Sequence, residues 1–218
     1  SAAADMTGPA QSASPAPTRS KRLFDIAVSG ALLLLLALPF AMVTILVAID
    51  SRGSPFFSQH RLGWKGRPFT MYKFRSMRKG SPPANAGASA EVPFLYLPRQ
   101  DPRITRLGKF LRRYSIDELP QLWNVLRGDM SLVGPRPFDV RDFEKGPFPY
   151  ARYDEWVRKR HQTRPGITGL WQVSGRNDTS FSELIALDLQ YVTNWTPAME
   201  VSILRRTLGA VVGGGGVY

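Results

Sequence analysis

The feature that most constrains this sequence is an uncharged, apolar segment near the N-terminus. It runs for 24 residues, 26–49, and lies between Asp25 and Asp50. As one helix it would be about 36 Å long, enough to cross the roughly 30 Å hydrocarbon core of a bilayer. A helix in the core of a globular protein is seldom apolar on every face. The segment therefore predicts a membrane-inserted helix, and its length argues against a cleaved signal peptide.

Pro39 lies in the middle of this segment. A proline inside a helix removes a backbone hydrogen bond and kinks or breaks the helix, and each part here is too short to cross alone. A spanning helix usually has excess positive charge on one side only. Here both sides are positive, with Arg19, Lys21 and Arg22 before the segment and Arg52, Arg61, Lys65 and Arg67 after it. We therefore predict a re-entrant helix–break–helix with both ends on the cytoplasmic face; a kinked full span is the alternative.

Composition excludes several classes of protein. The chain has no cysteine, so a disulfide scaffold, a zinc ribbon and a thiol nucleophile are excluded. His60 and His161 are its only histidines, and neither an HExxH nor a GxSxG pattern supports a zinc or serine hydrolase. With 29 Lys and Arg against 17 Asp and Glu, the net charge of +12 favours an anionic partner.

The chain divides into three predicted parts. Residues 1–19 are rich in Ala, Ser and Pro and are expected to be disordered, residues 20–50 form the membrane hairpin, and residues 51–218 form a compact cytosolic catalytic domain. That domain is predicted to be α/β, mostly helical with a small sheet and with interfacial amphipathic helices. Expected strands are 55–60 and 68–77, helices are 103–114, 116–127, 180–193 and 197–212, and loops are 79–99, 134–150 and 163–178. Thr196 and Pro197 suit the N-cap and first position of the last helix.

Asp117 and Glu118 form the strongest candidate site. Ser115 and Glu118 match an Ser-x-x-Glu capping box, although Pro120 also allows Asp117 as the cap. Either way the carboxylates are expected at a helix N-terminus, and a simple capped helix is the alternative to a functional site. Arginines crowd nearby segments: Arg103, Arg106, Arg112, Arg113, Arg127, Arg136, Arg164 and Arg176. Paired carboxylates beside guanidiniums suit a magnesium-bound diphosphate, and an ionised Asp can attack phosphorus.

Six blocks of sequence carry a resemblance to a known family. They are KRLFD (21–25), YKFRSM (72–77), SIDELPQLWNVL (115–126), GDMSLVGPRP (128–137), RPGITG (164–169) and GRN (175–177). In this order they resemble the bacterial sugar transferases, in particular the small form of the monotopic phosphoglycosyl transferases. That family has a re-entrant helix broken at a Ser-Pro pair, whereas this chain has Leu38 before Pro39.

The resemblance implies a reaction and a location. A UDP-sugar gives its sugar-1-phosphate, for exopolysaccharide types often galactose- or glucose-1-phosphate, to undecaprenyl phosphate, with release of UMP. The implied cofactor is Mg²⁺, the implied site is the cytoplasmic face of the bacterial inner membrane, and phospholipid is a further partner. The reaction would be the first membrane step of exopolysaccharide or other surface glycoconjugate synthesis.

The resemblance also assigns residues. Asp117 is implied to be the nucleophile that takes the phosphosugar, Glu118 its acidic partner, and both are expected at the metal. Arg112 matches a family arginine that holds a phosphate, and Asp188 matches another functional acidic position. The predicted substrate-binding residues are completed by Lys73, Arg75, Arg136, Arg164, Arg176 and Asn177. An exposed ion pair with a carboxylate is the alternative role for Lys73, Arg75, Arg136 and Arg176.

Three other functions compete with this one. A membrane-anchored module could bind nucleic acid or acidic lipid, with Tyr72, Tyr114, Trp123 and Trp171 stacking on bases, but no nucleic-acid motif is present and we expect no nucleic-acid partner. A conventional glycosyltransferase would often carry an Asp-x-Asp metal motif, which this sequence lacks. A structural anchor of a polysaccharide-export complex would not need Asp117. Homo-oligomerisation is left open.

Overall fold

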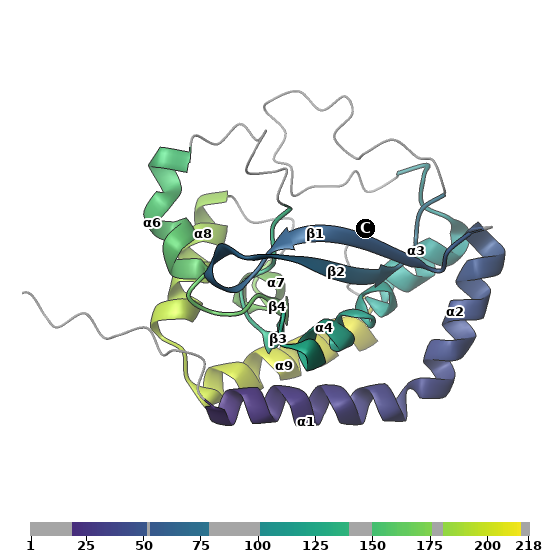
Figure 1. The fold of residues 1–218 in the computed structure, drawn as a ribbon, viewed down its shortest axis with the longest axis horizontal. Helices are drawn as coiled ribbons and strands as arrows, with labels where there is room; N and C mark the ends of the chain where they lie inside the picture. Colours follow the sequence, from purple (N-terminus) through teal and green to yellow (C-terminus); the bar gives the residue numbers. More distant parts are fainter. Residues whose placement is uncertain (1–18, 52, 79–100, 140–149, 176–180, 215–218) are drawn as a thin grey trace, which may run out of the picture.

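The computed structural model describes residues 19–51, 53–78, 101–139, 150–175 and 181–214. Most of the predicted disordered segment 1–19, the predicted loop 79–99, and Arg176 and Asn177 lie outside these residues. Within them the chain is mostly helical and has two small two-stranded sheets, which confirms the predicted α/β class. Helices α1 and α2 run along two sides of the remaining elements (Figure 1).

The apolar segment forms two helices, α1 (Arg19–Leu35) and α2 (Ala37–Ser51). No single helix in the described residues is long and apolar enough to cross a membrane. This pair passes the same test together, but it is bent by 66°. The predicted break was at Pro39, whereas the helix breaks at Leu36, because a proline ring clashes with the carbonyl four residues earlier. Regular bonding resumes where Phe40 N donates to Leu36 O at 2.8 Å.

A β-hairpin follows α2. Strands β1 (Phe56–Leu62) and β2 (Pro68–Phe74) are antiparallel, with Phe56 opposite Phe74 and Leu62 opposite Pro68, as predicted. The short 3₁₀ turn η1 (Trp64–Gly66) connects them, and Lys65 and Gly66 both have positive φ there. Val47 of α2 packs against Phe74 of β2, so the end of α2 is joined to the hairpin by contact as well as by sequence.

The elements around the acidic pair differ from the prediction. The structure has α3 (Arg106–Arg113), the 3₁₀ turn η2 (Ile116–Glu118) and α4 (Gln121–Arg127). Both predicted caps are wrong: Ser115 makes no capping bond and has a φ of 53°, and Asp117 lies inside η2. Because Pro120 cannot donate a backbone hydrogen bond, the α-helix begins after it, and the carboxylates occupy the preceding turn.

Four elements were not predicted. The strand β4 (Gly166–Thr168) and the helix α7 (Leu170–Val173) lie within the predicted loop 163–178. The strand β3 (Ser131–Val133) and the helix α6 (Tyr150–Arg160) lie in stretches to which no element was assigned, apart from Tyr150 at the end of the predicted loop 134–150. The strands β3 and β4 pair in parallel, and three residues are too few to show an alternating pattern in sequence. The last two helices, α8 (Phe181–Thr193) and α9 (Pro197–Val212), confirm the prediction. Thr196 caps α9 by accepting from Met199 N at 3.1 Å.

Helix α1 turns its polar residues inward. Asp25 is only 2% exposed and accepts hydrogen bonds from Ser131 Oγ at 2.7 Å and Leu132 N at 3.2 Å. Arg22 donates to the carbonyls of Val125 and Leu126 at the end of α4. Lys21 pairs with Glu200 of α9 at 2.5 Å. These contacts fix the start of α1 to the domain and give the KRLFD block a structural role.

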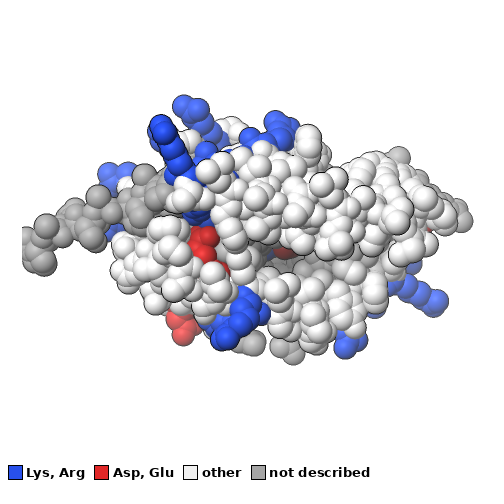
Figure 2. All heavy atoms as spheres, turned by 90° about the horizontal axis from the view of Figure 1, so that it is seen from below, with Lys and Arg blue, Asp and Glu red and all other residues white. Residues whose placement is uncertain are grey.

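The outward side of α1, α2 and α9 is apolar. Its exposed large side chains are Leu23, Phe24, Ile26, Leu34, Leu35, Leu38, Met42, Ile45, Leu46, Ile49, Val201, Leu208 and Val212. Seen from the α1 side, the described surface is mostly uncharged, with Lys and Arg toward its edges (Figure 2). An exposed set of large apolar side chains of this kind is typical of a surface that contacts lipid or a protein partner.

His161 gives the fold a pH dependence. Burial, together with the nearby charge of Arg160, lowers the pKa of His161 to about 4, although a contact with the Val157 carbonyl opposes this. Below about pH 6.5 the unfolded chain binds a proton that the folded protein does not. This contribution to stability is complete above pH 6.5 and is lost as the pH falls toward 4. Between about pH 7.5 and about pH 5 we expect the unfolding free energy to fall by about 2 kcal/mol.

Chemical denaturation of the wild type and of His161→Gln at the two pH values measures this effect. In the variant, the unfolding free energy should no longer show the change that arises from His161. The changes that arise from other titratable groups should be equal in both proteins. If the unfolding free energy changed equally with pH in the two proteins, the prediction would be contradicted.

Candidate active site

Four parts of the chain meet at the acidic pair. Turn η2 carries Asp117 and Glu118, the end of β2 carries Lys73, α3 carries Arg112, and the segment after β3 carries Arg136. Leu119, at the end of η2, packs against the buried residues of the hydrophobic core, and this holds the turn beneath the hairpin. Residues separated by up to about sixty positions in sequence are thus brought into one site.

Glu118 is paired with two cations. Lys73 Nζ lies 2.8 Å from Glu118 Oε1, and Arg136 Nη1 lies 3.6 Å from the same oxygen. Burial lowers the pKa of Lys73, while the charge of Glu118 raises it in opposition. The two cations neutralise Glu118 within the site and bring positive charge close to Asp117.

Asp117 is buried, at 7% exposed, and is the member of the acidic pair that has no direct partner among the described residues. Within the described part of the chain, its side chain makes no hydrogen bond and no ion pair within 4 Å. Burial raises the pKa of Asp117, and Glu118 adds to this, whereas the charges of Lys73, Arg112 and Arg136 lower it. Such a carboxylate is desolvated, makes no hydrogen bond and lies close to positive charges. These properties suit it to attack an electrophile.

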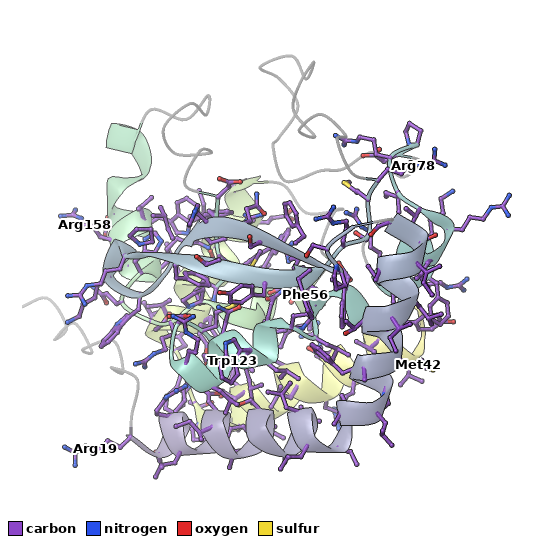
Figure 3. The ribbon with its side chains drawn as sticks, turned by 45° about the vertical axis from the view of Figure 1, so that its right-hand side comes forward. Arg19, Met42, Phe56, Arg78, Trp123 and Arg158 are labelled. Carbon is purple, nitrogen blue, oxygen red and sulfur yellow. The ribbon has the colours of Figure 1, made fainter. Side chains whose placement is uncertain are left out.

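Arg112 is held by the end of the hairpin. Its Nε donates to Ser76 Oγ at 2.8 Å, and burial lowers its pKa while Asp117 raises it in opposition. Arg75 is adjacent; its backbone N donates to Pro55 O at 2.8 Å, and its Nε is buried with no hydrogen-bond partner in the described residues. Phe56, labelled in Figure 3, packs against Phe40 and Phe74 and joins this end of the hairpin to α2. Arg112 therefore acts on Asp117, whereas no contact of Arg75 with the acidic pair is found in the described residues.

The predicted arginine cluster is smaller than expected. Of the eight arginines, Arg112 and Arg136 act on the pKa of Asp117. Arg103 pairs with Asp101, and Arg127 lies 3.5 Å from Asp129. Arg164 donates to Gly128 O at 2.8 Å and stacks over Trp64, so in the described residues it has a structural contact and none with the acidic pair.

Asp188 is also separate from the acidic pair. It is buried and forms an ion pair with Arg160 at 3.0 Å. No pattern in the sequence points to Arg160, because a single Arg in a charged helix has no distinguishing neighbours. Ser76 lies within the YKFRSM block, but its position there does not predict that it holds Arg112. Arg176 and Asn177 lie outside the described residues, and their predicted roles stay predictions.

The donor set can be compared with the needs of Mg²⁺. In the part of the chain that the structure describes, no group of three or more His, Cys, Asp or Glu side chains could hold a metal. Asp117 and Glu118 offer two adjacent carboxylates. Mg²⁺ is commonly held by one or two carboxylates together with substrate phosphates and water. The residues therefore fit Mg²⁺ that arrives with a diphosphate.

Comparison with known proteins places the chain in a family. A profile described as "Bacterial sugar transferase" matches residues 16–214. The chain belongs to the bacterial sugar transferase family. The predicted resemblance is thereby confirmed at the family level, and its finer assignment to the small form stays a prediction.

The similarity to individual relatives covers most of this chain, but it covers different shares of the relatives. It is 42% identical to the UDP-galactose-lipid carrier transferase of Erwinia amylovora, over 91% of this chain and 41% of the relative. It is 40% identical to the undecaprenyl-phosphate galactose phosphotransferase of Salmonella typhimurium, over 91% and 41%. It is 39% identical to the exopolysaccharide production protein ExoY of Rhizobium meliloti, over 91% and 88%. The chain thus spans about two fifths of the first two relatives and most of the third.

Proposed function

We propose that this transferase moves a sugar-1-phosphate from a UDP-sugar to undecaprenyl phosphate, releasing UMP and forming undecaprenyl-diphosphate-sugar. The observation that carries the proposal is Asp117, a buried carboxylate without a direct partner in the described residues, which faces the charges of Lys73, Arg112 and Arg136. The names of two relatives include a lipid carrier or undecaprenyl phosphate, and both include galactose. We propose galactose-1-phosphate or glucose-1-phosphate as the transferred group, in exopolysaccharide or related synthesis.

The reaction has two balanced steps. A carboxylate oxygen of Asp117 attacks the sugar-linked phosphorus of the UDP-sugar; the bond from this phosphorus to the bridging oxygen breaks, and UMP leaves with that oxygen. A phosphate oxygen of undecaprenyl phosphate then attacks the same phosphorus, and the bond to Asp117 breaks, which restores the carboxylate. One phosphoanhydride replaces another, so the exchange needs no external energy source.

The surrounding side chains have distinct tasks in these steps. Arg112, held by Ser76, brings a guanidinium charge close to Asp117, and there it would bind the anionic diphosphate. Lys73 and Arg136 balance the charge of Glu118, which would otherwise repel that diphosphate. Mg²⁺ held by Asp117, Glu118 and the diphosphate would neutralise charge on the departing UMP. The site so described needs only one anionic substrate at a time.

The membrane arrangement follows from the two ends of the bent helix pair. The start of α1 is fixed to the domain by Lys21, Arg22 and Asp25, and α2 leads directly into β1. With both ends on one body, we propose that the pair enters one leaflet and returns, which keeps the domain on the cytoplasmic face of the inner membrane. The apolar side chains at the bend would then contact phospholipid, and the polyprenyl chain of the acceptor would remain in the same bilayer.

Leu38 at the bend tests this arrangement, because it is 84% exposed and packs little against the domain. We expect Leu38→Asp to weaken binding to liposomes about 100-fold, since placing an Asp in a bilayer costs about 3 kcal/mol. Cosedimentation with liposomes measures the binding. Ser58→Asp is the control, because Ser58 is exposed on β1, away from α1 in Figure 1. Equal binding of the two variants would contradict insertion of the bend.

The function itself is tested by incubating the full chain with a panel of labelled UDP-hexoses, Mg²⁺ and undecaprenyl phosphate. We expect UMP release with one or a few of the donors. In the absence of the acceptor, we expect the mass of one phosphohexose on the peptide that contains Asp117. Absence of UMP release with every donor would overturn the proposed function.

A further inference from the structure

The segment that carries Arg136 has its carbonyl groups bonded at four successive residues. Two prolines flank Arg136, and prolines restrict the backbone conformations of the segment. The donors are Gly166 N to Pro135 O at 3.0 Å, Arg160 Nη2 to Arg136 O at 2.7 Å, Arg61 Nη1 to Pro137 O at 3.2 Å, and Leu62 N to Phe138 O at 3.0 Å. A segment bonded at every one of these carbonyls holds its side chains in a defined position.

Arg160 is the donor that bonds to Arg136 itself. Its side chain is buried, with the residue only 3% exposed, and its guanidinium lies 3.9 Å from the ring centroid of Phe138 and 5.0 Å from that of Trp156. Asp188 supplies the opposite charge, with Oδ2 3.0 Å from Arg160 Nε. A guanidinium buried between two aromatic rings requires such a partner, because an unpaired buried charge is strongly unfavourable.

We propose that Asp188 is a positioning residue, which acts through Arg160 to hold the backbone of Arg136 where its guanidinium can reach Glu118. Asp188 would therefore not bind substrate, in contrast to its predicted role. The link runs over four groups: the Asp188 carboxylate, the Arg160 guanidinium, the Arg136 carbonyl and, from the Arg136 side chain, the Glu118 carboxylate 3.6 Å away. This inference rests on the proposed function, since its consequence is the charge balance next to Asp117.

The geometry explains why a remote carboxylate would affect the chemistry. Arg160 uses Nε for Asp188 and Nη2 for Arg136, so one guanidinium connects α8 to the segment after β3. Without Asp188, Arg160 would be drawn toward other acceptors or solvent, and its bond to Arg136 would weaken. A displacement of about 1 Å at a catalytic group can reduce the rate about 100-fold. The expected defect lies in kcat, because the formation of the phosphosugar depends on the charges around Asp117.

Asp188→Asn and Arg160→Lys test the link from both sides. Lysine can retain the ion pair with Asp188, but its single ammonium group cannot also bond Arg136 O in the geometry of a guanidinium. For each variant we expect kcat to fall about 10- to 100-fold with a smaller change in KM for the UDP-sugar. A control is Glu155→Gln, which makes the same carboxylate-to-amide change on α6, where Glu155 is exposed, pairs with Lys159 and makes no bond to the Arg136 segment.

A double-mutant cycle with Arg136→Ala distinguishes positioning from other roles. In the Arg136→Ala background, Asp188→Asn and Arg160→Lys should have little further effect on kcat. Full additivity would overturn the proposal, because it would show that Asp188 acts independently of Arg136, for example on substrate. Wild-type kcat in both single variants would overturn it as well. If Asp188→Asn fails to fold, Arg160→Lys decides the question.

Hydrogen exchange provides a readout that does not depend on activity. In both single variants, amides of the 131–139 peptide should exchange faster than in the wild type and in Glu155→Gln. Unchanged exchange there would overturn the proposal. If the wild type releases no UMP from any donor, the proposed function fails, while the exchange result still reports whether Asp188 and Arg160 hold this segment.

Discussion

Asp117→Asn is expected to abolish UMP release while the protein remains folded and bound to membranes. The amide keeps the shape of the side chain but removes the negative charge that attacks phosphorus. Because Asp117 has no direct partner in the described residues, the substitution breaks no hydrogen bond or ion pair there. We expect kcat to fall by about 10⁴-fold or more, as for other enzymes that lose their nucleophile. UMP release and the mass of the Asp117 peptide measure the effect.

Glu155→Gln is the control for this substitution. Glu155 lies on the surface and pairs with Lys159 one turn later in α6, so its loss should leave turnover unchanged. Glu118→Gln should retain some phosphosugar transfer, since it leaves the attacking carboxylate in place. Wild-type turnover in Asp117→Asn would show that the phosphosugar is not carried on this residue, and a rival such as a structural anchor would then gain support.

Gly166→Ala is expected to have the largest effect on the fold. Gly166 begins β4 where this strand lies against Gly134, and a Cβ here would overlap with Gly134 N and Thr168 O and lie 2.7 Å from the carbonyl carbon of Val133. These are backbone atoms that cannot move aside independently. We expect the unfolding free energy to fall by about 3 kcal/mol or more, together with loss of soluble protein on purification.

Gly209→Ala provides the matched control in α9. A Cβ at this position would meet no atom within 4 Å, and alanine favours a helix over glycine by about 1 kcal/mol. Its unfolding free energy should therefore be equal to or above that of the wild type. Denaturant unfolding of both variants in the same detergent measures the difference in their unfolding free energies. Equal values would contradict the prediction, because they would show that β3 and β4 can move apart to accommodate a Cβ at position 166.

Long, regular patterns were predicted correctly, and short elements were not. The hairpin of β1 and β2 and the helices α8 and α9 show their periodicity over seven or more residues. The strands β3 and β4 are three residues each and form only because the 32 intervening residues bring Val133 and Gly166 together. Local sequence could not predict them, because each strand is completed by a partner that is remote along the chain.

In the candidate site, too, some residues were predicted correctly and others were not. Residue type and the sequence blocks identified Asp117 and Glu118, and the structure places Lys73, Arg112 and Arg136 around them. Ser115 was predicted as a cap from its spacing, but Pro120 moves the helix start and leaves Ser115 in a left-handed turn. Arg164 has the residue type of a phosphate site, and Asp188 matches a functional acidic position of the family, yet they bond to Gly128 and to Arg160.

The sequence by itself determined that the chain has a membrane-length apolar segment interrupted by proline, that Asp117 and Glu118 are adjacent, and that the family is the bacterial sugar transferases. These properties depend on neighbouring residues or on whole blocks of sequence. Only the tertiary structure decided which cations surround Asp117 and how Asp188 is connected to Arg136. The physical reason is that charge interactions act over a few ångströms in space, and chain folding alone sets which remote side chains come within that distance.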